Sequence, residues 1–69
     1  MPAADATGLT TREDEVIRLL AEGLPVRAIS ARLYISPVTV RNHLQHIMAK
    51  LDLHSQRETV AYAYRHNLF

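Results

Sequence analysis

Apolar residues recur along most of this chain at the three- and four-residue spacing of helices that bury one face. The repeat is clearest over residues 37–51, where four apolar side chains fall on one stripe: Val40, Leu44, Ile47 and Leu51. Shorter stripes of the same kind occur within residues 11–22, 25–33 and 56–66. No segment alternates apolar and polar residues as a half-buried strand does. The pattern therefore predicts an all-α protein of four helices.

Residues that favour helix ends bound the first and the last of these segments. Thr10 and Glu13 have the spacing of a capping box, in which each side chain bonds the backbone N–H of the other residue. Ser55 and Glu58 repeat this spacing, so we expect a second capping box before the fourth helix. Asn67 suits the left-handed conformation that ends many helices.

A three-residue turn, 34–36, separates the second predicted helix from the third. Its last residue, Ser36, can accept hydrogen bonds from the free N–H groups of a first helical turn. Pro37 follows and fits the first helical position, where its missing N–H costs nothing. Both residues favour a helix that begins directly after the turn.

The outward face of the helix at 37–51 has one fixed cation, Arg41, and no carboxylate before Asp52. Because a solvated helix face usually mixes charge signs, an acid-free face favours contact with a polyanion. A helix, a tight turn and an acid-free helix form the helix-turn-helix arrangement, whose second helix enters the DNA major groove.

Length and composition limit the kinds of protein that this chain can be. The 69 residues, with a formal net charge of +1, fit one small domain. We expect residues 1–8 to be a disordered leader or linker remnant and residues 9–69 to form the domain, with 68–69 folded back as an apolar cover.

The charged residues are unevenly distributed along the chain. Residues 1–22 hold five acidic residues and two arginines, whereas residues 23–69 hold six basic residues and two acidic ones. The chain has no cysteine for a disulfide or thiolate site, and no apolar run approaches the ~20 residues of a membrane span.

From Leu9 onward the chain resembles the LuxR/NarL/FixJ-type (GerE-like) DNA-binding domain of bacterial transcription regulators. The resemblance implies a four-helix domain whose second and third helices form the helix-turn-helix and whose fourth helix commonly supplies a dimer contact. It rests on five segments in a fixed order and spacing: LTTREDEV at 9–16, LLAEGL at 19–24, ISARLYIS at 29–36, TVRNH at 39–43 and KL at 50–51.

The resemblance also implies which side chains meet DNA. Four positions on the third helix match residues that point into the major groove: Val38, Arg41, Asn42 and Gln45. Five further positions match residues in regions that contact phosphates: Ser36, Thr39, Lys50, Ser55 and Arg57.

The chemistry of these side chains supports a DNA contact more strongly for some residues than for others. Arg41 can bond guanine O6 and N7 together, which is worth ~1–3 kcal/mol of discrimination. Asn42 can bond adenine or a phosphate. Gln45 is either a base contact or a solvated helix former, and Val38 either meets a thymine methyl group or is merely exposed. Lys50 is either a phosphate contact or an ordinary surface cation.

The chain departs from the family pattern at several positions. Relatives often have Lys where Val38 stands, and the loss of that cation predicts weaker binding or a preference for thymine. They often have Ser or Thr at Pro25, Glu at Ala28, and Gly or Asn at Asp52. These changes affect the expected affinity and target more than the expected fold.

Two other kinds of site find less support. His43 and His46 are one helical turn apart, but no cysteine or nearby carboxylate completes a metal site. The acidic cluster at 13–15 lies in a first helical turn, where the helix dipole explains it. We expect no metal, no cofactor and no catalytic residue.

The fourth predicted helix has three large apolar or aromatic residues at alternate positions, Val60, Tyr62 and Tyr64. They cannot all face the same side of a helix, so part of this surface is exposed unless a partner covers it. We therefore expect a homodimer through this helix.

Together these observations predict sequence-specific binding of double-stranded DNA by a cytoplasmic transcription regulator. A receiver or sensor domain would precede residue 1, although a stand-alone domain is equally compatible with Met1. RNA polymerase is a further candidate partner. The alternative is a protein-interaction module that binds a regulator or a polymerase subunit, and salt dependence distinguishes the two, because phosphate contacts weaken steeply with added salt.

Overall fold

The computed structural model describes residues 8–67, and within them it contains helices and no strand. Four helices follow one another: α2 (Thr11–Ala21), α3 (Val26–Leu33), α4 (Pro37–Leu51) and α5 (Gln56–Arg65). The all-α prediction is confirmed, and each boundary lies within one residue of its predicted position. With 15 residues, α4 is the longest of the four helices.

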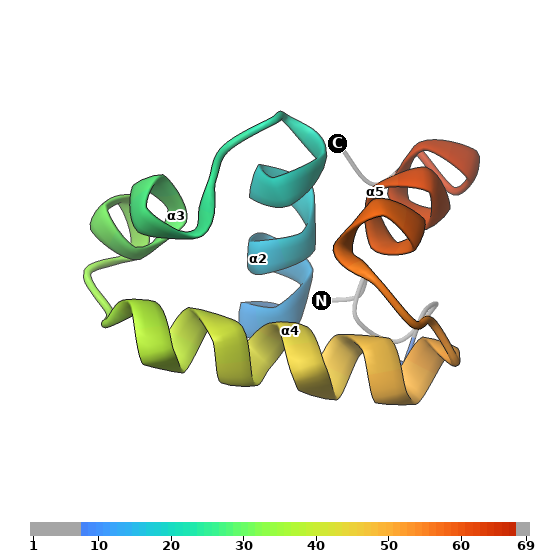
Figure 1. The fold of residues 1–69 in the computed structure, drawn as a ribbon, viewed down its shortest axis with the longest axis horizontal. Coiled ribbons are helices and arrows are strands. Elements are labelled where there is room, and N and C mark those ends of the chain that lie inside the picture. The colour runs from blue at the N-terminus through green and yellow to red at the C-terminus, as the bar shows by residue number, and fades with distance from the viewer. Residues whose placement is uncertain (1–7, 68–69) are drawn as a thin grey trace.

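The helix α2 packs against each of the other three, and α3 also packs against α4. In Figure 1, α4 lies along one side of the molecule, the N-terminal end of α2 meets it, and α3 and α5 lie on opposite sides of α2. The core between them draws on all four helices: Val16, Ile17, Leu20, Ile29, Val40, Leu44, Ile47 and Ala63. Of the stripe predicted on α4, Leu51 alone is only half-buried.

The first predicted capping box is confirmed. The Glu13 N–H donates to Thr10 Oγ1 at 3.1 Å, and the Thr10 N–H donates to Glu13 Oε1 at 3.0 Å. These two bonds fix the start of α2 and explain why Glu13, with 4% of its surface exposed, tolerates burial.

The second predicted capping box was wrong in one of its two bonds. Ser55 Oγ accepts from the Glu58 N–H at 3.1 Å, as expected. The Glu58 carboxylate, however, accepts from the N–H of His54 at 2.7 Å. The backbone φ is −159° at Ser55 and −71° at Thr10, and this difference points the Ser55 N–H in another direction.

Residues in the left-handed conformation end both α3 and α4. Tyr34 at φ 58° ends α3, and Asp52 at φ 56° ends α4. Asn67 at φ 54° confirms the predicted left-handed cap after α5. Within the turn at 34–36, the Ile35 N–H donates to the Ser30 carbonyl at 3.1 Å, and the Ser30 hydroxyl donates to the Ile35 carbonyl. These bonds hold α4 in a fixed direction relative to α3.

The expected leader and the expected apolar cover fall on residues 1–7 and 68–69, which lie outside the described residues. Among residues 8–67, no helix has the length and the apolar composition needed to cross a membrane.

Candidate nucleic-acid interface

The start of α4 is fixed by a local hydrogen-bond network. Ser36 is the N-cap, its Oγ accepts from the Thr39 N–H at 3.1 Å, and Pro37 occupies the first helical position. The two hydroxyl groups of Ser36 and Thr39 also share a hydrogen bond of 2.9 Å. Because only one hydroxyl hydrogen is used in that bond, the other remains available for an acceptor such as a phosphate oxygen.

The four predicted base contacts all lie on the exposed surface of α4. Val38 has 61% of its surface exposed, and Arg41, Asn42 and Gln45 are exposed as well. The helix contains no acidic residue, and Arg41 forms no ion pair with any residue in the described part of the chain. The structure therefore presents an acid-free face whose arginine has no ion-pair partner among residues 8–67.

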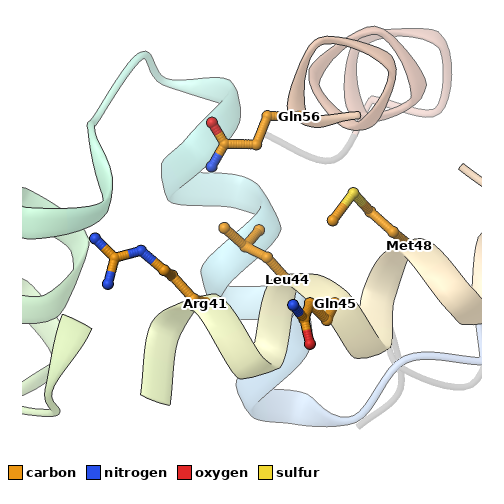
Figure 2. A pocket seen from close by; sticks show the side chains of 5 residues that line it. All are labelled: Arg41, Leu44, Gln45, Met48 and Gln56. Carbon is orange, nitrogen blue, oxygen red and sulfur yellow. The ribbon is translucent and has the colours of Figure 1, made fainter. Parts of the chain in front are cut away.

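A hollow of about 170 Å³ lies along one side of this face, between α4 and the start of α5. Figure 2 shows Arg41, Leu44 and Met48 extending from α4 on that side and Gln56 extending from α5 toward α2. Its lining residues are Arg41, Leu44, Gln45, Met48 and Gln56. The sequence analysis did not single out Met48 or Gln56, because their proximity depends on how α5 packs across the molecule.

Two of the predicted phosphate contacts lie at the start of α5. Ser55 is the N-cap of this helix and Arg57 is in its first turn, and both are exposed. Ser55 Oγ accepts from the Glu58 N–H, which leaves the hydroxyl hydrogen without an acceptor among the described residues. Arg57 forms no ion pair within residues 8–67. Both groups can therefore donate to an anion.

The fifth predicted phosphate contact, Lys50, is already paired. Its Nζ lies 2.7 Å from Glu13 Oε1. Burial opposes ionisation of Glu13, but hydrogen bonds from Lys50 and from the Thr10 N–H outweigh it and keep the pKa of Glu13 below its ordinary value. A phosphate contact by Lys50 stays a prediction, and it would compete with this ion pair.

The three predicted interface residues of α5 differ in environment. Val60 and Tyr62 are half-buried against the core, whereas Tyr64 has 53% of its surface exposed. The Tyr64 hydroxyl donates to the Ala21 carbonyl at 2.8 Å, so this side chain also ties α5 to the end of α2. The ring of Tyr62 stacks on that of His66 with centroids 4.1 Å apart. As predicted, the three side chains do not share one face.

The two histidines of α4 differ in burial. His43 is half-buried and His46 is exposed. Within residues 8–67, no three His, Cys, Asp or Glu side chains form a group that could hold a metal ion.

The three helices α2, α3 and α4, with their tight turn at 34–36, define a helix-turn-helix domain, and α5 completes it. Comparison with known families agrees, because residues 7–63 match the family described as bacterial regulatory proteins, luxR family. The chain belongs to this family, as its resemblance predicted.

Individual relatives are regulators that are much longer than this chain. One is an HTH-type transcriptional regulator of Mycobacterium bovis, 45% identical over 64 residues, which are 93% of this chain and 7% of the relative. Another is the nitrate/nitrite response regulator protein NarL of Escherichia coli, 35% identical over 65 residues, 94% of this chain and 30% of the relative. A third is the response regulator protein VraR of Staphylococcus aureus, 37% identical over 60 residues, 87% of this chain and 29% of the relative. The chain thus spans less than a third of the length of each.

Proposed function

We propose that this chain binds double-stranded DNA sequence-specifically, as the output domain of a bacterial transcription regulator, with α4 in the major groove. The observation that best supports this is the outward face of α4, which is exposed, acid-free and fixed in direction by the turn at 34–36. A rigid helix of this kind presents side chains to base edges in a defined register. Membership of the luxR family supports the same function.

In this proposal the side chains that contact DNA divide into two groups. Val38, Arg41, Asn42 and Gln45 meet base edges, with Arg41 donating to guanine O6 and N7. The available donors at the two helix starts meet phosphates on either side of the groove: Ser36, Thr39, Ser55 and Arg57. Phosphate contacts set the register, and base contacts supply the discrimination.

The proposal extends to partners by analogy with the relatives. The names of NarL and VraR describe response regulators, and this chain covers 30% or less of either protein. We propose that a receiver or sensor domain lies outside this chain, that α5 forms a homodimer contact, and that RNA polymerase is a downstream partner. Binding to a bacterial chromosome would place the protein in the cytoplasm.

Selection of bound sites from a random duplex pool tests the proposal. We expect one enriched motif, with guanine at a position that becomes degenerate in Arg41→Ala. Affinity for that motif should fall with added salt, with a logarithmic slope of about −0.9 per neutralised phosphate. Salt-dependent binding without a motif would overturn sequence specificity. Absence of any salt-dependent duplex binding would favour the protein-interaction alternative.

A further inference from the structure

Lys50 is the only lysine in the chain; the other seven basic residues are arginines. It lies in the last turn of α4, and its Nζ contacts Glu13 Oε1 at 2.7 Å, 37 residues away in the sequence. The two side chains differ in environment, because 39% of the Lys50 side-chain surface is exposed but only 5% of the Glu13 side-chain surface. A carboxylate so deeply buried requires a partner, since an unpaired buried charge is strongly destabilising.

One carboxylate oxygen of Glu13 accepts two hydrogen bonds. Its Oε1 accepts from the Thr10 N–H at 3.0 Å, which completes the capping box of α2. The same oxygen accepts from Lys50, which belongs to α4. The pair therefore fastens the last turn of α4 to the first turn of α2. Within residues 8–67, no other ion pair joins α4 to another helix.

The two flanks of α4 are held unequally. One flank bears Lys50 and its ion pair, while the opposite flank borders the open hollow that Arg41 and Met48 line. Val40, Leu44 and Ile47 are buried and turn one side of α4 toward the core, and the bond from Lys50 to Glu13 adds a polar tie at the C-terminal end of the helix, on the flank away from the hollow. Because Arg41 and Gln45 project from α4, a rotation of this helix displaces both from a base edge.

We propose that Lys50 is a positioning residue that holds α4 through Glu13 in the orientation needed for base readout, and that it does not contact phosphate. This inference rests on the proposed DNA-binding function. It assigns Lys50 a role that differs from the phosphate contact predicted from the sequence.

Two neutral variants separate the ion pair from the cap. Glu13→Gln removes the charge but keeps a side-chain oxygen that can accept from the Thr10 N–H. Lys50→Met removes the ammonium and keeps an unbranched apolar stem. Lys50→Arg retains the charge and should restore the pair. Glu15→Gln is the matched control, because its ion pair with Arg12 is 3.1 Å long on the same helix, with 47% and 42% of the side chains exposed.

Thermal unfolding measures the ion pair without DNA. Lys50→Met should lower the midpoint by about 5 to 15 °C, because it leaves a buried carboxylate unpaired. Glu13→Gln should lower it by less, because the remaining ammonium can reach water. Glu15→Gln should leave the midpoint within about 2 °C of the wild type.

DNA binding, measured well below each midpoint, tests the positioning role. We expect Lys50→Met and Glu13→Gln to lower the affinity ratio between selected and random duplex at least about tenfold, with unchanged salt slopes, and Lys50→Arg to restore the ratio. A slope reduced by about 0.9 in Lys50→Met but not in Glu13→Gln would identify a phosphate contact and overturn the proposal. Unchanged ratios in both variants would show a purely structural pair and also overturn it.

The outcomes distinguish this inference from the function on which it rests. If the wild type selects no DNA motif, the proposed function fails, and the midpoints still show whether the ion pair between Lys50 and Glu13 stabilises the domain. If Lys50→Met does not fold, Glu13→Gln and Lys50→Arg provide the same comparison, because neither leaves a buried carboxylate without a cation.

Discussion

Tyr34 and Asp52 both occupy the left-handed region, where residues other than glycine usually cost about 1–2 kcal/mol. The cost is clearer for Tyr34, because asparagine and aspartate can partly offset it through local hydrogen bonds and tyrosine cannot. Tyr34 also has 94% of its surface exposed, so its ring gains little from packing in the isolated domain. The hydrogen bonds between Ser30 and Ile35, and not the type of residue at position 34, therefore hold the turn between α3 and α4.

Tyr34→Gly should raise the free energy of unfolding by about 0.5–1 kcal/mol, because glycine adopts positive φ without steric cost. For a domain of this size the midpoint should rise by roughly 2–8 °C. The matched control is Ala49→Gly, an exposed position inside α4, which should lower stability by about 1 kcal/mol. A lower midpoint for Tyr34→Gly would show that the tyrosine ring stabilises the turn.

The Glu13 carboxylate gives stability a defined dependence on pH. Its pKa lies below the ordinary value of 4.5 in the folded protein. The stabilisation of the folded protein by ionised Glu13 is therefore complete above about pH 4.5, and it is lost as the pH falls through the lowered native pKa of Glu13. Thermal unfolding should show the wild type more stable than Glu13→Gln at pH 7, with the difference shrinking at acidic pH. A difference of equal size at pH 7 and at about pH 2.5 would contradict this linkage.

Sequence reasoning located the bonds that depend on near neighbours. The bond between Thr10 and Glu13 spans three residues, so a motif sufficed to predict it. The bond between Glu13 and Lys50 spans 37 residues and exists only because α2 and α4 pack together. Without that packing, Lys50 was indistinguishable from a surface cation, and its interaction with Glu13 was missed.

At the scale of the helices, α4 and α5 offer two arginines in different roles. Arg41→Ala should lose about 1–3 kcal/mol of discrimination at one or two base pairs of the selected motif. Arg57→Ala, at the start of α5, should weaken selected and random duplexes alike and reduce the salt slope by about one unit. Fluorescence anisotropy over a salt series measures both quantities. Equal losses on both duplexes for both variants would refute the division of roles.

The bounds of α4 could be predicted from the sequence more fully than the residues that surround its outer face. Its two ends were fixed by Ser36, Pro37 and the repeat of buried residues, all of which are local features. The hollow beside Arg41 depends on where α5 lies, and α5 is placed by nonlocal contacts such as the hydrogen bond from Tyr64 to Ala21. Local patterns do not encode such contacts, so the neighbours of Arg41 could not be inferred.

For the molecule as a whole, the small size of the interface limits what one copy can recognise. A single recognition helix reads few base pairs, whereas two copies related by two-fold symmetry read two half-sites about one helical turn apart. Of the four described helices, α4 faces the proposed DNA, α2 is surrounded by the other three, and α3 packs on α2 and α4 as the first helix of the helix-turn-helix. The exposed side of α5, which includes Tyr64, is therefore the surface we expect to join two copies.

Charge placed on that surface should abolish cooperative binding to paired half-sites, because burying an unpaired charge in a dimer contact is costly. Tyr64→Glu removes the hydrogen bond from Tyr64 to Ala21 as well as adding a charge. A second variant, Ala61→Glu, adds the charge and leaves that bond intact. Ala61 is half-buried and lies one helical turn from Tyr64. We expect Ala61→Glu to bind a single half-site with nearly wild-type affinity and a paired site without cooperativity. Titration of both duplexes, with thermal unfolding to confirm the fold, measures this. Cooperative filling of paired sites by both variants would exclude α5 as the dimer contact, because a carboxylate buried in that contact should weaken it.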